Sequence, residues 1–259
     1  MPPGRNGYRV AAPSASMDDT TALVTGVSRG IGAALARRFV AEGAHVVGCA
    51  RNTEALDSLA GDIRAEGDAD DANGTDDTGT VTVQRADVRD EYDIERLAET
   101  AAGAGDTGDI DLVVANAGVY HGPPGETRLD GESYAAVDEH LRTNARGVFA
   151  TVRESLPHLA ADARVLVPSG SIAREAQPGI GSYAVSKAAA EALARGFAAE
   201  IDHPVGVVDP GQVATGLAGE QGRDPEEIAE MFVWAATEIE PDELDGEIVD
   251  LRAWRQATR

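Results

Sequence analysis

The chain has 259 residues, of which 42% are hydrophobic and 26% are charged, and its formal net charge at pH 7 is −23. This length and hydrophobic content are enough to bury one sizeable core, so a single domain is expected. The acidic excess repels phosphate backbones and anionic bilayers, which argues against nucleic acid or a membrane as partner. No apolar run approaches the ~18 residues of a membrane span, and the N-terminus lacks the order of a signal peptide, so a cytoplasmic protein is expected.

Lysine is nearly absent, because Lys187 is the single lysine beside 21 arginines, whereas Asp and Glu together number 45. At molar salt the Debye length falls to ~3 Å, so an acidic surface loses much of its self-repulsion while it stays hydrated. The composition resembles that of proteins from extreme halophiles; the alternative is an acidic protein of an ordinary cytoplasm. The lone Cys49 cannot form an intramolecular disulfide and is expected to be a small buried hydrophobe in a reducing compartment.

Short apolar strands alternate with helical stretches along the chain, which is the order of βαβ units in a parallel sheet. The first strand ends in glycine and is followed by the helical pattern of residues 33–43. The strands are apolar throughout, as expected where helices cover both faces of a sheet. We therefore expect an α/β, doubly wound parallel sheet of about seven strands, at residues 21–26, 44–50, 81–88, 111–118, 163–170 and 204–211 and within 242–251.

Two segments fall outside this pattern. Residues 1–19 are expected to be a disordered extension of a single domain that covers 20–259, and Met17 is a possible natural start. The acidic stretch 67–79 has no apolar period and is expected to be a disordered loop inserted into the second crossover.

The first chemical motif is TGVSRGIG at residues 25–32, between a predicted strand and a predicted helix. Glycines there allow a tight turn and close approach of the backbone, and a helix N-terminus attracts a pyrophosphate. Its spacing, G-x3-G-x-G, differs from the commoner dinucleotide fingerprint. Alone, such a turn is also compatible with tight packing only.

Further motifs follow in chain order and decide between these interpretations. They are ADV at 86–88, ANAG at 115–118, Asn144 in RTNARGVF, SGS at 169–171, YAVSK at 183–187 and PGQVAT at 210–215. Together with the glycine turn they resemble the short-chain dehydrogenase/reductase family over residues 20 to 251. The resemblance implies a single-domain Rossmann-type fold that binds a nicotinamide cofactor and interconverts a carbonyl and an alcohol.

Tyr183 and Lys187 stand four residues apart, which places both on one face of a helix. A nearby ammonium favours phenolate and lowers the pKa of a tyrosine from ~10 toward the working pH, so Tyr183 is expected to be a general acid or base. In the family the tyrosine exchanges a proton with the substrate, and the lysine holds the nicotinamide ribose. An arginine presents a planar fork that does not replace a compact ammonium, which explains why this lysine is kept.

The other catalytic candidates rest on the resemblance. Asn144 matches the family asparagine that helps to hold a proton-relay water through its place in helix packing. Without the resemblance, an Asn in this segment would more often be a helix-interrupting or cap residue. An ungapped alignment puts Gly170 at the position of the catalytic serine. Ser171 is the favoured replacement, Ser169 is the alternative, and a third possibility is that both only bond the turn backbone.

Cofactor choice is expected to depend on the end of the second strand. Ala50 stands where NAD enzymes carry an acidic residue, and Arg51 and Arg29 are cations suited to the 2′-phosphate, so NADP(H) is expected. By resemblance, the remaining cofactor-binding candidates are Gly26, Ser28, Gly30, Ile31, Gly32, Asn52, Asp87, Val88, Asn116, Ala117, Gly118, Tyr183, Lys187, Pro210, Gly211, Val213 and Thr215.

Metal binding and substrate identity complete the expectations. The five histidines are scattered, so no metal site is predicted. The segment after residue 215 leaves little room for a lid, so the pocket is expected to be open to a small-molecule carbonyl or alcohol of unspecified identity. Helices near 134–160 and 183–201 match those that pair subunits in the family, and a homodimer or homotetramer is expected.

One function of a different class stays open beside the NADP(H)-dependent oxidoreductase. Gly170 and the short lid also fit a non-catalytic NADP(H)-binding sensor or partner-binding module on the same fold. A sugar-nucleotide epimerase or dehydratase would need a larger C-terminal substrate domain than this chain carries.

Overall fold

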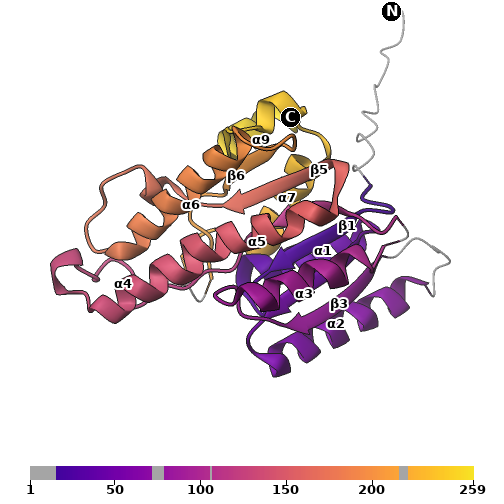
Figure 1. Cartoon of the computed structure of the whole chain (residues 1–259), viewed down its shortest axis with the longest axis horizontal. Coiled ribbons are helices and arrows are strands. Elements are labelled where there is room, and N and C mark those ends of the chain that lie inside the picture. Colours follow the sequence, from indigo (N-terminus) through magenta and orange to yellow (C-terminus); the bar gives the residue numbers. More distant parts are fainter. Residues whose placement is uncertain (1–15, 72–78, 106, 216–220) are drawn as a thin grey trace, which may run out of the picture.

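The expected strands form a parallel sheet. The computed structural model describes residues 16–71, 79–105, 107–215 and 221–259, and in this part the strand order is β3-β2-β1-β4-β5-β6-β7 (Figure 1). The strands are β1 (Thr21–Thr25), β2 (His45–Ala50), β3 (Thr80–Arg85), β4 (Ile110–Val114), β5 (Leu159–Pro168), β6 (Val205–Asp209) and β7 (Ile248–Asp250). The prediction of a single-domain, doubly wound Rossmann-type sheet of about seven strands is confirmed.

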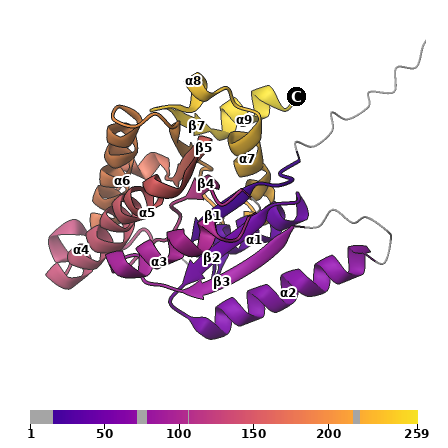
Figure 2. The ribbon, with the colours of Figure 1, turned by 45° about the vertical axis from the view of Figure 1, so that its right-hand side comes forward.

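Helices cover both faces of the sheet (Figure 2). On one face Phe39 of α1 and Phe232 of α7 belong to the same buried cluster, and on the other Ile94, Val152 and Ala190 join α3, α5 and α6 in a second cluster. Strands buried between two helical layers explain the continuous apolar runs in the sequence. The helices are α1 (Gly30–Ala41), α2 (Thr53–Asp71), α3 (Glu91–Ala102), α4 (Tyr134–His140), α5 (Gly147–Ser155), α6 (Ser182–Ala198), α7 (Pro225–Thr237), α8 (Pro241–Leu244) and α9 (Leu251–Ala257).

The strand order reverses at β1, which pairs with β2 on one side and with β4 on the other. In open parallel sheets a ligand crevice forms at such a reversal, beyond the carboxyl ends of the strands. The segments after β1, β2, β4, β5 and β6 therefore converge at one edge of the sheet. Those segments contain the motifs that the sequence analysis selected.

Two expected irregular segments are partly built into the fold. The described residues of the N-terminal extension begin at Ser16, and Met17 is 1% exposed within the core, with its backbone N–H donating to Glu42 O at 2.7 Å. Residues 67–71 of the acidic segment are the last residues of α2 rather than a loop. Residues 1–15 and 72–78 lie outside the described part of the chain.

Candidate active site

A pocket of about 1410 Å³ opens at the carboxyl edge of the sheet. Of the residues predicted for catalysis or cofactor binding, all but Asn144 line it. The pocket also draws on residues that the sequence analysis did not select, most of them on the side of Tyr183. These include Tyr120, Pro124, Gly125, Ile172, Gln177, Ile180 and Gln212.

The glycine turn is shaped by close backbone contacts. Gly26 and Gly30 have positive φ angles of 78° and 58°, and a Cβ on Gly32 would lie 2.3 Å from Gly26 O. Helix α1 starts directly after Arg29, and no side chain caps its first N–H groups. A tight glycine cradle beneath uncapped helix N–H groups fits the pyrophosphate of a dinucleotide.

Asn116 holds this turn against β4. Its Nδ2 donates to Thr25 O at 2.8 Å and to Gly26 O at 3.3 Å, and Ala117 N–H donates to Thr25 Oγ1 at 3.1 Å. The sequence analysis assigned Asn116 and Ala117 to the adenosine side of the cofactor. Their hydrogen bonds show that they also fix the turn that would carry the pyrophosphate.

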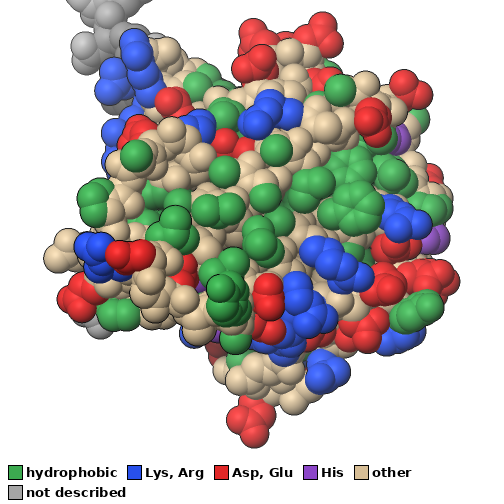
Figure 3. Space-filling model, turned by 60° about the vertical axis from the view of Figure 1, so that its left-hand side comes forward, with side chains coloured by type: hydrophobic (Ala, Val, Ile, Leu, Met, Phe, Trp, Pro, Cys, Tyr) green, Lys and Arg blue, Asp and Glu red, His purple; other side chains and the backbone are tan. Residues whose placement is uncertain are grey.

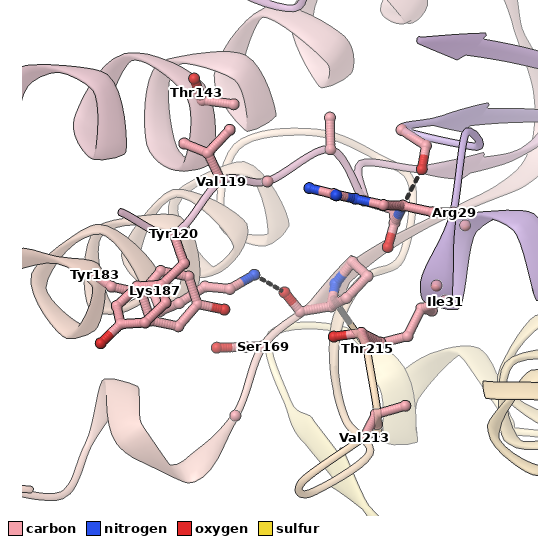
Figure 4. Close-up of a pocket in the computed structure, with 18 of the residues that line it drawn as sticks. Arg29, Ile31, Val119, Tyr120, Thr143, Ser169, Tyr183, Lys187, Val213 and Thr215 are labelled. Carbon is pink, nitrogen blue, oxygen red and sulfur yellow. Dashed lines mark hydrogen bonds between the residues drawn. The ribbon is translucent and has the colours of Figure 1, made fainter. Parts of the chain in front are cut away.

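Cations and one tethered carboxylate line the adenosine end of the pocket. Arg29 and Arg51 are exposed beside the buried Ala50, and Figure 4 shows the Arg29 side chain extending into the pocket. Asp87 is paired with Arg89 at 2.6 Å, and these hydrogen bonds lower the pKa of the Asp87 carboxyl. Arg89 was missed from the sequence, although an arginine two residues after the aspartate is a visible signal.

Tyr183 and Lys187 lie one turn apart on α6 and both face the pocket (Figure 4). Lys187 Nζ donates to Pro168 O at 2.9 Å, at the end of β5. Burial lowers the pKa of Lys187 to about 8, against the opposing effect of the nearby Glu191 carboxylate. The residue pair that the sequence analysis selected therefore converges on the ends of β5 and β6.

The expected effect of Lys187 on Tyr183 is wrong for this structure. Burial raises the pKa of the Tyr183 phenol well above its usual value, and the neighbouring Tyr120 raises it further. The Tyr120 and Tyr183 rings meet edge to face with centroids 4.9 Å apart. Because the ammonium group of Lys187 is directed to Pro168, burial dominates, and the phenol is held protonated.

Asn144 supports the site without lining it. It lies in the π-helical turn Leu141–Arg146 and is 1% exposed. Its Oδ1 accepts from Val119 N–H at 2.7 Å, and its Nδ2 donates to Val119 O and to Ser186 Oγ, both at 2.9 Å. In this structure its side chain thus joins the chain after β4 to α6, and its role toward a relay water stays a prediction. π-Helical turns often occur at functional sites.

The two candidate serines differ in their surroundings. Ser169 is 9% exposed and its Oγ donates to Glu191 Oε1 at 2.7 Å. Ser171 is exposed, and its Oγ donates to Glu175 Oε2 over a longer 3.2 Å. Gly170 stands between them, and all three line the pocket. The Ser169 proton is committed to a buried carboxylate, whereas the Ser171 hydroxyl has only a weak solvent-exposed partner.

The wall beyond Tyr183 is made by two loops that bond to each other. Thr127 pairs with Ile180 through a β-bridge, Thr127 N–H donates to Gly179 O at 2.9 Å, and Tyr120 Oη donates to the same oxygen at 3.2 Å. Sequence reasoning gave no signal for this contact, because residues more than fifty positions apart form it. The wall combines aromatic and aliphatic surface with the amide of Gln177.

A buried polar chain supports the start of α6. His140 Nε2 accepts from His121 N–H at 2.9 Å, so its proton lies on Nδ1, which is 2.7 Å from Ser182 Oγ. Ser182 in turn donates to Glu132 Oε1 at 3.0 Å. Burial lowers the pKa of His140, so the imidazole is neutral within this row of hydrogen bonds.

Cys49 is a packing residue of the sheet. It is buried in β2, and burial raises the pKa of its thiol to about 12, so the thiol is unreactive.

Among the described residues, no group of three or more His, Cys, Asp or Glu side chains is arranged to hold a metal ion. No described helix is long and apolar enough to cross a bilayer.

Comparison with known proteins agrees with this arrangement. The sequence profile of the family described as short chain dehydrogenase matches residues 20–226. This chain belongs to the short-chain dehydrogenase family.

Individual relatives span different shares of the chain. Glycine betaine reductase from Emericella nidulans is 30% identical over 92% of this chain, which covers only 19% of that protein. Short-chain dehydrogenase/reductase FrzI from Cladobotryum is 31% identical over 84% of this chain and 80% of its own length. A short chain dehydrogenase from Burkholderia cenocepacia, solved with NADP, has a TM-score of 0.76 and 25% identity, over 92% and 98% of the two chains. The chain thus spans only a small part of some relatives and most of others, and both its sequence and its fold agree with membership of the family.

Proposed function

We propose that the protein is an NADP(H)-dependent oxidoreductase that interconverts a carbonyl group and an alcohol, with Tyr183 as the general acid or base. The observation that carries the proposal is the Tyr183–Lys187 pair on one face of α6, directed into a pocket that also contains the glycine turn. Lys187 is the single lysine of the chain. On a surface helix with no functional role, we would expect an arginine at this position, as elsewhere in the sequence.

The preference for NADP(H) rests on the adenosine end of the pocket. Arg29 and Arg51 line the pocket beside Ala50, where an acidic side chain would favour the 2′-hydroxyl of NAD. Two exposed guanidinium groups instead suit a 2′-phosphate, because charge-assisted hydrogen bonds to phosphate are strong and often bidentate. The NADP bound in the Burkholderia cenocepacia relative is consistent with this assignment.

The chemistry divides between the cofactor and this chain. The bound nicotinamide supplies or accepts the hydride. Tyr183 is held protonated by its buried surroundings, so it starts as the proton donor to the oxygen of a carbonyl substrate. By resemblance to the family, Lys187 would hold the nicotinamide ribose, from a position in which its ammonium group also donates to Pro168 O.

For the hydroxyl that polarises the carbonyl we retain Ser171. Its weak, exposed hydrogen bond to Glu175 leaves the proton exchangeable, whereas Ser169 donates to the buried Glu191. Asn144 is assigned to positioning, because it fixes Val119 and α6 at the two borders of the pocket.

We also propose that the enzyme is cytoplasmic, that it comes from a halophile, and that it forms a homodimer or a homotetramer. Figure 3, which brings forward the side that carries α4, α5 and α6, shows hydrophobic side chains spread among acidic and basic ones. Phe149 and Val185, which are 38% and 49% exposed, belong to the helices that the resemblance assigns to subunit pairing. The net charge of −23 supports assays in molar salt.

The test is the consumption of NADPH in buffer with molar KCl. The panel contains ketones, aldehydes, keto-sugars and 3-oxoacyl thioesters, with NADH in parallel and the Tyr183→Phe variant as control. Turnover that prefers NADPH and is lost in the variant supports the proposal. Tight NADPH binding with no turnover over the whole panel would favour the non-catalytic binding module instead.

A further inference from the structure

Three charged side chains form a buried cluster behind the site. Arg174 Nη1 donates to Glu191 Oε1 at 2.8 Å, and Arg174 Nη2 donates to Asp209 Oδ2. The side chains of Glu191 and Asp209 are 2% and 8% exposed, and that of Arg174 is 34% exposed. One guanidinium thus bridges two carboxylates that are almost completely removed from water.

Each member of the cluster belongs to a different part of the site. Arg174 follows Gly170 and Ser171 in the loop after β5. Glu191 lies on α6, one turn after Lys187, and also accepts from Ser169 Oγ at 2.7 Å. Since Lys187 itself donates to Pro168 O, helix α6 is attached to two consecutive residues at the end of β5.

Asp209 connects the cluster to the opposite wall of the pocket. It is the last residue of β6, and its Oδ1 accepts from Gly211 N–H at 3.0 Å. Gly211 belongs to the loop of residues 210–215 that the family resemblance assigns to the nicotinamide carboxamide. The other carboxylate oxygen of Asp209 binds Arg174, so one side chain shapes this loop and ties it to the loop after β5.

The geometry requires an arginine. Two buried carboxylates near each other are unfavourable unless a cation with donors in two directions lies between them. A guanidinium offers such donors in a rigid fork, whereas an ammonium is a single point charge. Arg195 also approaches Glu191, but only at 4.0 Å and with 53% of its side chain exposed, so it does not replace Arg174.

We infer that Arg174 is a positioning residue for the proposed reaction, because it bridges Glu191 and Asp209 and so holds α6 and the loop after β6 in one fixed arrangement. The inference rests on the proposed function for the reaction that it serves. The contacts with Glu191 and Asp209 set how the Tyr183–Lys187 pair faces the nicotinamide side of the pocket. Arg174 itself does not line the pocket and touches no reacting atom.

The experiment compares Arg174→Met with the matched control Arg195→Met, which removes a second arginine from the same carboxylate. NADPH dissociation constants are measured by fluorescence titration, together with kcat, KM and thermal midpoints. For Arg174→Met we expect NADPH affinity and kcat/KM to fall about 10- to 100-fold, as for a misplaced catalytic group. For Arg195→Met every value stays within about twofold, because exposed ion pairs contribute little. Arg174→Lys should recover thermal stability better than catalysis.

A pH series separates positioning from stability alone. Without Arg174, less positive charge lies beside the Glu191 carboxylate. The negative charge of Glu191 then raises the pKa of Lys187 above about 8. The pH at which NADPH affinity is lost should therefore move upward in Arg174→Met, and should move back when Glu191→Gln is added. A variant that melts earlier but keeps its affinity, kcat and pH midpoint within about twofold overturns the inference.

Two further measurements distinguish failure of the inference from a variant that does not fold and from failure of the proposed reaction. If Arg174→Met does not fold, Asp209→Asn replaces it: an amide oxygen remains for Gly211, one carboxylate remains for Arg174, and NADPH affinity should still fall about tenfold. An unchanged affinity in folded Asp209→Asn also contradicts the inference. If the wild-type chain binds NADPH but reduces no carbonyl, the proposed reaction fails, while the binding measurements still decide whether Arg174 positions the cofactor side.

Discussion

The two ends of the pocket are built on different principles. At the proposed adenosine end, Arg29 and Arg51 are exposed, so the proposed recognition of the 2′-phosphate would rest on charges at the surface. At the Tyr183 end the side chains of Asn144, Glu191 and Asp209 are buried, and hydrogen bonds join each of them to another segment of the chain. Exposed charges tolerate small displacements and are screened by salt, whereas a buried network acts as a unit. Mutations at the exposed end should therefore change mainly the preference between NADPH and NADH, whereas mutations at the buried end should change the rate of reaction and the fit of the nicotinamide side.

The largest expected effect is at the buried end. Tyr183→Phe keeps the ring that packs edge to face on Tyr120 but removes the proton donor. We expect kcat to fall about 10²- to 10⁴-fold, the usual contribution of a general acid. The NADPH dissociation constant, measured by fluorescence, should change less than about threefold. A kcat within tenfold of the wild type would show that another group transfers the proton.

The exposed end should give the complementary result. The double variant Arg29→Ser/Arg51→Ser removes two cations from the predicted 2′-phosphate site, at about tenfold for each charge-assisted contact. We expect kcat/KM for NADPH to fall about 100-fold through KM, while the value for NADH stays the same or rises. Steady-state kinetics with both cofactors measures this. Equal losses with NADPH and NADH would contradict the assignment of the arginines to the 2′-phosphate.

A third variant tests whether the buried end acts as a unit. Asn144→Ala removes the side-chain partners of the part-buried N–H and C=O of Val119. The free energy of unfolding should fall by about 1–3 kcal/mol for the unpaired groups, and kcat should fall with it. Urea denaturation and kinetics on the same sample give both numbers. The solvent-exposed control Ser133→Ala removes only a helix-cap acceptor for Ala136 and should change stability by about 1 kcal/mol, with kcat unaffected.

The smallest expected effect is on pH dependence. The pKa of Lys187 is about 8, so its ammonium is present below that pH and is lost as the pH rises through it. NADPH affinity should thus be greatest near pH 7 and should fall by about half at pH 8, where half of the amines are neutral. Titrations from pH 6.5 to 9.5 in constant salt measure this. An affinity that is flat across the range would separate Lys187 from cofactor binding.

The fold was largely predictable because the strands are short, apolar and separated by helical periods. The runs at 21–26 and 204–211 match β1 and β6 within one or two residues. What the sequence did not show depends on distant contacts. In the sequence Met17 belongs to an irregular N-terminal segment, and only the fold shows that its backbone N–H donates to Glu42 O. Residues 67–71 have no apolar period, yet they form the last residues of α2.

In the site, local motifs located the residues but not their environments. Tyr183, Lys187 and the glycine turn were found by spacing. The raised pKa of Tyr183 and the orientation of Asn144 follow from burial and from contacts across the sheet, which spacing does not encode. Arg174 and Glu191 look like ordinary surface charges of a helical region. Only the fold shows that they meet Asp209, which stands 35 positions after Arg174.

The solitary lysine also makes the active site chemically addressable. Amine-reactive reagents attack the neutral form of an amine, and with a pKa of about 8 Lys187 has a large neutral fraction in mild alkali. In this sequence the only other target is the N-terminal amine. Acylation of one internal site would therefore count vacant pockets directly by mass spectrometry, and a bound nucleotide would protect it. The single lysine would therefore serve as a built-in probe of pocket occupancy.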